Sequence, residues 1–238
     1  MTISSVSFIW FDLGYTLVYR DREAVYRRFL LERGIDLPLA RIEQAYHLTD
    51  KLFMREYPGV LGKEPHSFMP WYLGVLNYRL GVRFPLQEQY ARLMELQDGK
   101  RDWRAYPFAK EVLAALRARS LGIGLISNWD ATARDVLEET GLLPYFDHII
   151  VSSEVKAEKP DEAIFRLALR AAGLPAHACL YVGDNYYDDV VGSAKVGMAS
   201  LLINRFGTLG IEELTGVRTI SSIREIPRLL DAPREIAT

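Results

Sequence analysis

The sequence has few of the residues on which several common kinds of site depend. It contains a single cysteine, Cys179, among 238 residues, so it has no internal disulfide. Because Cys179 lies in the apolar stretch Ala-Cys-Leu-Tyr-Val, we interpret it as a core residue rather than a reactive thiol. The four histidines show no metal-ligand spacing, and we assign them no role: His47, His66, His148 and His177.

Long apolar runs and an excess of basic residues are also missing. No run approaches the roughly 18 apolar residues of a membrane span, and Met1-Thr-Ile-Ser lacks the basic start of a signal peptide. Lysine and arginine number 29 against 31 acidic residues, for a formal net charge of -2, so no overall basic field recruits nucleic acid or an acidic membrane. We therefore expect a cytoplasmic protein that binds neither, as a monomer or a homodimer.

What is present is the composition of an ordinary globular protein, with 49% hydrophobic and 25% charged residues. The segment from Phe8 to Thr16 reads Phe-Ile-Trp-Phe-Asp-Leu-Gly-Tyr-Thr. Its apolar, β-branched and aromatic residues, followed by an acid and a glycine-containing turn, predict a buried strand that ends at Asp12. A carboxylate there is costly unless a metal, hydrogen-bond donors or chemistry hold it.

Four helices are predicted after this strand. The first follows Tyr19-Arg-Asp-Arg and stops at Gly34, and the others are marked by apolar residues at helical spacing over 39–53, 68–80 and 86–96. Pro70 is expected near the first turn of the third helix or at a kink, and Asp98-Gly99 closes the fourth. Short connections with no strand between them favour a separate helical bundle.

From residue 101 onward the pattern alternates between strand and helix. Strands are predicted at 122–126, 148–151, 179–182 and 199–203, and helices at 107–119, 131–139, 161–172 and 189–195, with a short strand at 218–220 and a helix at 222–230 closing the chain. Such alternation predicts a parallel sheet with right-handed crossovers. The predicted fold is therefore α/β, with a Rossmann-like core of residues 1–18 and 99–238 and an inserted four-helix cap domain of residues 19–98.

Polar residues follow four of the predicted strands, at the edge where ligands gather in open α/β sheets. They are Asp12, Ser127-Asn128, Lys159 in Ala-Glu-Lys-Pro-Asp, and Gly183-Asp184 with Asp188 and Asp189. Acids, a hydroxyl and a lysine without histidine suit Mg²⁺-assisted phosphoryl transfer. Lys156 is a rival to Lys159 because both lie in one loop, Pro160 can begin the next helix, and Asp188 and Asp189 could instead cap the helix that follows.

In this order the motifs resemble the haloacid dehalogenase superfamily, in its phosphatase-like branch with a helical cap after the first strand. The resemblance implies that Asp12 is a nucleophile that forms an aspartyl-phosphate, that Ser127 binds a phosphoryl oxygen, and that Lys159 pairs with phosphate and Asp12. It also implies a Mg²⁺ site of Asp12, the Gly14 carbonyl, Asp184 and a second acid, for which we prefer Asp189 by spacing. We expect Asn128, Tyr15 and Trp129 to contact a small phosphorylated substrate, and Tyr186 and Tyr187 also flank the site.

One departure from that family pattern concerns residue 14. Phosphatases of the family read Asp-x-Asp-x-Thr, whereas this chain reads Asp12-Leu-Gly14-Tyr-Thr16, so the second aspartate, the general acid and base, is missing. Positioned acid–base catalysis is worth roughly 10²–10⁴ in rate, or about 3–5 kcal/mol of barrier. We therefore predict a slowed phosphatase that favours leaving groups needing no proton. Gly14 could also be a turn glycine that supplies positive φ.

Three explanations of the missing acid remain open. The first is a hydrolase of activated or aryl phosphates, or one that recruits an acid from Tyr15 or the cap. The second is a dehalogenase, or a phosphonate cleaver with a Schiff-base lysine at Lys51 or Lys63. The third is a non-catalytic phosphate or nucleotide binder. Phe68, Trp71 and Tyr72 have helical spacing, and we interpret them as cap core rather than substrate contacts.

Overall fold

The computed structural model describes residues 6–97 and 103–231, which form two compact units. One unit contains a parallel sheet and comprises residues 1–19, 103–207 and 214–238. The other is helical and comprises residues 20–102 and 208–213. Residues 208–213 thus group with the helices, although the sequence analysis assigned them to the sheet domain. The predicted helix stop at Asp98-Gly99 lies outside the described residues.

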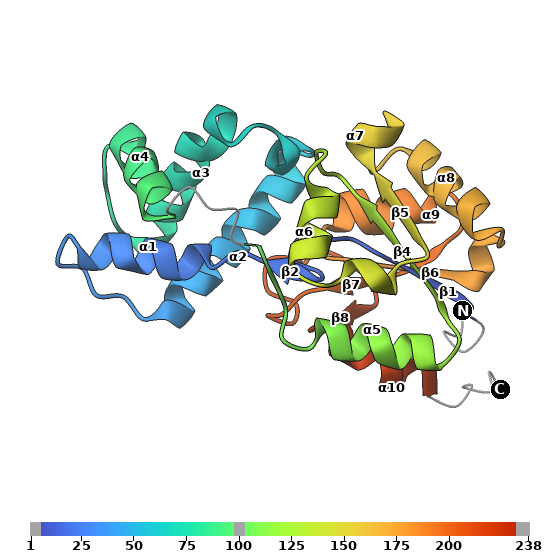
Figure 1. Cartoon of the computed structure of the whole chain (residues 1–238). Coiled ribbons are helices and arrows are strands. Elements are labelled where there is room, and N and C mark those ends of the chain that lie inside the picture. The colour runs from blue at the N-terminus through green and yellow to red at the C-terminus, as the bar shows by residue number, and fades with distance from the viewer. Residues whose placement is uncertain (1–5, 98–102, 232–238) are drawn as a thin grey trace. The chain divides into compact units, whose positions relative to one another are not determined.

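Six parallel strands form the sheet, in the order β5-β4-β1-β6-β7-β8 (Figure 1). They are β1 Phe8–Phe11, β4 Gly122–Ser127, β5 His148–Val151, β6 Cys179–Gly183, β7 Ala199–Ile203 and β8 Thr219–Ile220. The prediction of an α/β fold with a parallel, Rossmann-like sheet is confirmed. Central β1 is buried along its whole length between β4 and β6, which explains its continuous apolar run.

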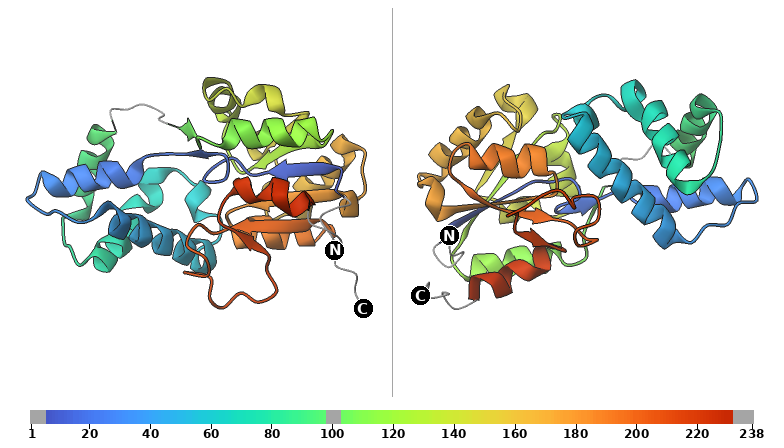
Figure 2. Two further views of the ribbon diagram at one scale, coloured as in Figure 1. Left: turned by 90° about the horizontal axis from the view of Figure 1, so that it is seen from below. Right: turned by 180° about the vertical axis from the view of Figure 1, so that it is seen from behind.

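Alternate residues of β1 point to two different hydrophobic clusters. Ile9 and Phe11 pack with α5 Ala109–Ala118, α6 Ala133–Glu139 and α10 Ile226–Asp231. Phe8 and Trp10 pack on the opposite face with α8 Glu162–Ala172, beside which lies α9 Val191–Ala194. Figure 2 shows α5 and α10 side by side on their face. The sheet therefore has a covered core on each side, as an α/β fold requires.

Glycines in β4 make room for the aromatic residues of β1. Gly122 pairs with Phe8, and Gly124 pairs with Trp10. A Cβ on Gly122 would lie 2.2 Å from the Phe8 ring, and one on Gly124 would lie 2.3 Å from the Trp10 ring. Both large rings can therefore lie flat against the neighbouring strand.

The structure corrects several element predictions. Val18–Tyr19 (β2) pairs antiparallel with Arg104–Ala105 (β3), where no strand was expected. The helix predicted at 189–195 is a π-helical turn, Tyr186–Val190, followed by α9, and an unpredicted short helix, α7, spans Ser152–Val155. Pro160 precedes α8 instead of starting it, because Asp161 is the N-cap and accepts a hydrogen bond from the Ala163 backbone N–H.

The helical unit is built from four long helices: α1 Arg22–Leu31, α2 Leu39–Glu56, α3 Pro65–Leu80 and α4 Leu86–Leu96. Pro70 lies inside α3, which begins one turn earlier than predicted. Phe68 and Tyr72 are buried in the unit's own hydrophobic cluster, whereas Trp71 is 41% exposed and so is not a core residue. The role of this unit as a cap stays a prediction.

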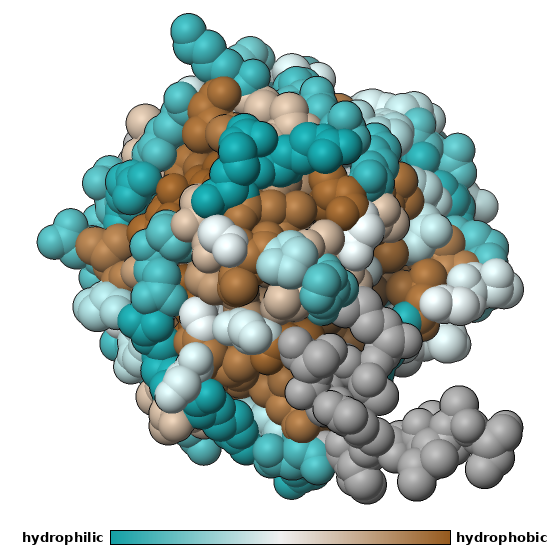
Figure 3. Space-filling view, turned by 90° about the vertical axis from the view of Figure 1, so that its right-hand side faces the viewer, coloured by the Kyte–Doolittle hydropathy of each residue, from teal (hydrophilic) through white to brown (hydrophobic). Residues whose placement is uncertain are grey.

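Among the described residues, no helix combines the length and the apolar character of a membrane span. The face in Figure 3 shows hydrophobic side chains surrounded by hydrophilic ones, a mixture that is usual for a globular protein. Cys179 is fully buried in β6, and burial raises the pKa of its thiol, which makes it a poor nucleophile.

Candidate active site

The carboxyl ends of β1, β4 and β6 bring the predicted polar residues together in the sheet unit. Asp12 directly follows β1, Ser127 is the last residue of β4, and Asp184 directly follows β6. Because parallel strands end at one edge of a sheet, residues far apart in sequence become neighbours there. Lys159 joins them from the loop between α7 and α8.

Lys159 is the centre of the hydrogen-bond network. Its ammonium donates to Asp12 Oδ1 at 2.8 Å, to Asp189 Oδ1 at 2.7 Å and to the Tyr181 hydroxyl at 2.9 Å. These three bonds use all the donors of an ammonium group. Lys159 is 4% exposed, whereas Lys156 is exposed, so the contact with Asp12 belongs to Lys159 and not to its rival.

Burial and charge set the protonation of this group. Burial opposes the charge on Lys159, but the carboxylates of Asp12 and Asp189 outweigh it and raise the pKa of Lys159 well above its ordinary value. Burial also raises the pKa of the Asp12 carboxyl, and nearby Asp189 adds to the rise while Lys159 opposes it. Lys159 therefore remains an ammonium, and the negative charges of Asp12 and Asp189 lie close to each other beside it.

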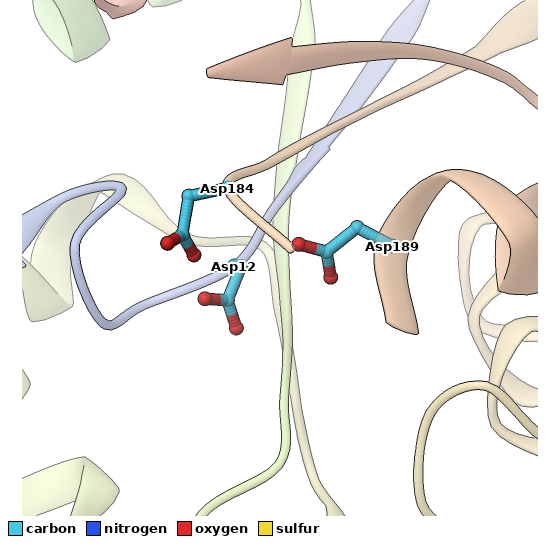
Figure 4. A group of neighbouring side chains, drawn as sticks. All are labelled: Asp12, Asp184 and Asp189. Atoms are coloured by element: carbon cyan, nitrogen blue, oxygen red, sulfur yellow. The ribbon is translucent and has the colours of Figure 1, made fainter. Parts of the chain in front are cut away.

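Three carboxylates converge at this edge of the sheet. One oxygen each of Asp12, Asp184 and Asp189 lie within 4.8 Å of one another, and Figure 4 shows the three side chains turned toward a shared space. Asp189 is 1% exposed and is held by Lys159 and, at Oδ2, by the backbone N–H of Asn185 at 2.9 Å. Carboxylate oxygens at this spacing are typical ligands of a hard divalent cation.

Asp188 faces a different environment from Asp189. Its Oδ2 accepts a hydrogen bond from the Asn185 side chain at 2.8 Å, whereas Oδ1 is buried without a hydrogen-bond partner. Burial is the main cause that raises the pKa of Asp188 to about 7, with Asp189 and Asp12 adding and Lys159 opposing. The N-cap of the π-helical turn Tyr186–Val190 is Asn185, whose side chain accepts hydrogen bonds from the backbone N–H groups of residues 187 and 188. Neither Asp188 nor Asp189 is therefore the N-cap residue considered from the sequence.

Ser127 and Asn128 use their side chains to fix the site. The Ser127 hydroxyl donates to Asp12 Oδ1 at 3.0 Å. The Asn128 amide bonds twice to the backbone of Lys159, donating to its carbonyl at 2.8 Å and accepting from its N–H at 2.7 Å. Asn128 therefore positions Lys159, while its contact with substrate stays a prediction.

Two participants were missed from the sequence. The Tyr181 hydroxyl accepts from Lys159 and donates to the Ile126 carbonyl at 2.9 Å, so this residue of β6 orients the lysine. Trp103 is the second, and its ring packs against Trp129 and Tyr15. A buried hydroxyl needs a partner, so Tyr181 carried a signal, whereas the place of Trp103 depends on the tertiary fold.

Gly14 lies where the turn after Asp12 meets the aromatic rings. Its φ is outside the left-handed region, so the alternative of a turn glycine with positive φ is wrong. The neighbouring Tyr15 adopts the left-handed conformation instead, with φ 53°.

Tyr186 and Tyr187, which were expected to flank the site, pack edge to face on each other, with their ring centroids 5.1 Å apart.

The sequence is similar to proteins of known family. The sequence matches the haloacid dehalogenase-like hydrolase family over residues 9–197. It is 29% identical over 207 residues to haloacid dehalogenase-like hydrolase domain-containing protein 3 of Danio rerio, covering 84% of this chain and 86% of that protein. It is 31% identical over 198 residues to glyceraldehyde 3-phosphate phosphatase of Methanothermobacter thermautotrophicus, covering 82% and 74%.

The fold has relatives among solved structures as well. The HAD-hydrolase YfnB of Bacillus subtilis superposes with a TM-score of 0.65 at 18% identity, covering 95% of this chain and 99% of that one. At this identity the likeness concerns the fold alone.

Proposed function

This chain belongs to the haloacid dehalogenase-like hydrolases, and from that membership we propose that it hydrolyses a small phosphorylated metabolite through an aspartyl-phosphate on Asp12. The observation that carries the proposal is the buried contact of Asp12 with Lys159 and Ser127 beside the carboxylates of Asp184 and Asp189. The phosphatase named among the relatives supports the same reaction class.

The donor set fits Mg²⁺. All three converging groups are carboxylates, they outnumber the single ammonium of Lys159, and no histidine or cysteine joins them among the described residues. Asp12, Asp184 and Asp189 would hold the cation, with the Gly14 carbonyl as a further oxygen ligand. When bound, Mg²⁺ would offset the charge of the acids and of the phosphate.

The chain's own residues account for the covalent steps. A carboxylate oxygen of Asp12 forms a bond to phosphorus while the bond from phosphorus to the leaving oxygen breaks, and the leaving group takes that electron pair. Lys159 and Ser127 hold Asp12 in position, and when phosphate binds they exchange their contacts with Asp12 Oδ1 for contacts with the phosphoryl oxygens. Water then attacks phosphorus, and the bond to Asp12 breaks to release phosphate and restore the carboxylate. Since residue 14 is glycine, the leaving group departs as its anion in the first step.

The test is steady-state hydrolysis of 4-nitrophenyl phosphate with Mg²⁺, comparing the natural protein with Asp12→Asn. We expect clear turnover in the natural protein and only the background rate in Asp12→Asn, because an amide is a far poorer nucleophile than a carboxylate. Asp135→Asn, the same change at an exposed position of α6, is the matched control and keeps full activity.

The cation site is tested separately by calorimetry with Mg²⁺. Asp184→Asn should weaken the affinity by at least about tenfold, since it removes one carboxylate of the cluster. Unchanged affinity would argue against this site. Phosphate binding without Asp12-dependent turnover would instead favour the non-catalytic binder, and halide release from 2-haloacids without Mg²⁺ would favour a dehalogenase.

A further inference from the structure

Three aromatic side chains form one group beside the proposed nucleophile. We call Tyr15, Trp103 and Trp129 the aromatic wall. The ring centroids of Tyr15 and Trp103 are 5.8 Å apart at 68°, and those of Trp103 and Trp129 are 4.7 Å apart at 56°. All three side chains are partly exposed, and they come from three separate segments of the sheet unit.

Two of the wall residues lie in the same loops as Asp12 and Ser127. Gly14 and Tyr15 follow Asp12 in one loop, and Trp129 follows Ser127 in another. The hydrogen bond between Ser127 and Asp12 joins the two loops, at 3.0 Å. The Trp129 ring is held in turn, since its Nε1 donates to Thr132 Oγ1 at 3.2 Å. The wall therefore begins three residues after Asp12 along one loop and two residues after Ser127 along the other.

The wall also leaves little room for a side chain at residue 14. A Cβ on Gly14 would lie 3.1 Å from Trp129 Cζ3 and 3.8 Å from Trp103 Cη2. The backbone of Gly14 is not in the left-handed region, so space and not backbone strain limits a side chain there. Any side chain at residue 14 requires the Trp129 indole to shift by a few tenths of an ångström. We therefore link the missing acid at residue 14 to the wall that lies against it.

We propose that the aromatic wall selects phosphate esters whose leaving group is a planar aromatic alcohol. This inference rests on the proposed hydrolysis and names its substrate class. A flat aryl group can stack on an indole face, and an aryl oxygen is acidic enough to leave without a general acid. The Asp12 oxygen bonds to phosphorus, the bond from phosphorus to the aryl oxygen breaks, and the aryloxide leaves with the electron pair and takes a proton from solvent.

The first experiment separates stacking from leaving-group acidity by measuring binding alone. In an Asp12→Asn background, at Mg²⁺ concentrations that saturate this variant, calorimetry compares phenyl phosphate with cyclohexyl phosphate, which are similar in size but differ in flatness. We expect phenyl phosphate to bind more tightly, and Trp129→Leu or Trp103→Leu to reduce that preference roughly three- to tenfold. Trp129→Phe should keep most of it, since a ring remains.

Tyr145→Leu is the matched control. Tyr145 is a half-buried aromatic residue of the sheet unit that precedes β5, at the edge opposite Asp12. It should leave the ratio of the two affinities unchanged. A wall that only packs the core would change both affinities alike, so an unchanged ratio in Trp129→Leu would overturn the inference.

The second experiment tests the exclusion of an acid at residue 14. With cyclohexyl phosphate, whose leaving group needs a proton, we expect no gain in kcat/KM for Gly14→Asp alone. Gly14→Asp combined with Trp129→Ala should exceed Trp129→Ala alone by at least tenfold, because the carboxyl then has room. A gain from Gly14→Asp alone would contradict the space argument, and circular dichroism shows that each variant is folded.

The two proposals fail in different ways. If neither ester is turned over above the Asp12→Asn rate, hydrolysis through Asp12 is wrong, whereas the binding ratio still decides what the wall recognises. If turnover depends on Asp12 but phenyl phosphate shows no preference that Trp129→Leu removes, the wall inference alone is wrong.

Discussion

The proposed cation site depends on a residue that has no side chain. Gly183 ends β6, and a Cβ there would lie 2.1 Å from Asp189 Oδ2 and 2.4 Å from its Cγ. We predict that Gly183→Ala pushes the Asp189 carboxylate away from Lys159, weakens Mg²⁺ binding at least about tenfold and lowers the free energy of unfolding by roughly 1–3 kcal/mol. Calorimetry and urea unfolding measure the two effects.

Gly62→Ala is the control for that substitution. No atom lies within 4 Å of a Cβ built on Gly62, and its φ is outside the left-handed region. It should bind Mg²⁺ as the natural protein does. Equal Mg²⁺ affinity in Gly183→Ala would show that Asp189 can move without harm to the site.

At the residue scale, the sequence predicted the position of those residues that lie at the ends of strands. Asp12, Ser127 and Asp184 could be placed together because each lies at the carboxyl end of a recognisable buried strand of a parallel sheet. The meaning of Gly14 could not be found this way. It depends on where the Trp129 and Trp103 rings lie, which only the folded chain determines.

The helical unit carries a buried polar network that joins three of its helices. The Tyr26 hydroxyl of α1 donates to Asn77 Oδ1 of α3, and the amides of Asn77 and Gln89, the latter on α4, exchange hydrogen bonds at 2.7 and 3.0 Å. Burial raises the pKa of Tyr26 to about 12, and the hydrogen bond with Gln89 opposes the rise. The folded unit therefore favours the neutral phenol.

We predict that Tyr26 makes this unit lose stability between about pH 10 and 12. In that window the unfolded chain releases the phenol proton while the folded chain keeps it, so stability falls as pH rises. Relative to Tyr26→Phe, the natural protein should lose about 1 kcal/mol in free energy of unfolding between pH 9 and 11. Urea unfolding at both pH values measures this difference.

Tyr78→Phe serves as the comparison, since Tyr78 is on α3 but is 86% exposed. Because it removes an exposed hydroxyl outside the buried network, it should change the free energy of unfolding little. A pH-independent difference between the natural protein and Tyr26→Phe would show that the phenol ionises equally easily in the folded and unfolded chains.

Long helices and strands were easier to predict from the sequence than short ones. The four long helices of the helical unit and the longer strands of the sheet follow their apolar periodicity. The pair β2 and β3 could not be predicted from the sequence. Each strand is only two residues long, and the four long helices separate the two strands along the chain. The turn at Tyr186–Val190 is π-helical, and the Asn185 backbone N–H before it donates to Asp189 Oδ2 within it, a local geometry that apolar periodicity does not report.

At the scale of the molecule, the hydrophobic clusters of the sheet unit and of the helical unit share no residues. Those around Ile9 and around Phe8 cover the two faces of the sheet, and the cluster around Tyr26 lies within the helical unit. Assigning residues 208–213 failed from sequence because they follow the sheet strand β7. In the fold the Leu209 carbonyl meets His47 Nε2 at 2.9 Å, and Glu213 pairs with Arg55 at 3.1 Å.

Separate cores predict two thermal transitions, of which only one responds to the cation. Mg²⁺ at a hundred times its dissociation constant should stabilise the sheet unit by about 2.7 kcal/mol, which raises its midpoint by roughly 5–10 °C. Scanning calorimetry with and without Mg²⁺ measures this shift. At the same Mg²⁺ concentration Asp184→Asn should at least halve it, because a tenfold weaker affinity leaves about 1.4 kcal/mol of stabilisation. Tyr26→Phe should lower only the other midpoint, since it removes hydrogen bonds confined to the helical unit. A single transition whose midpoint responds both to Mg²⁺ and to Tyr26→Phe would mean that the two cores unfold together. In that case the stability of one unit would depend on the other unit as well as on its own core.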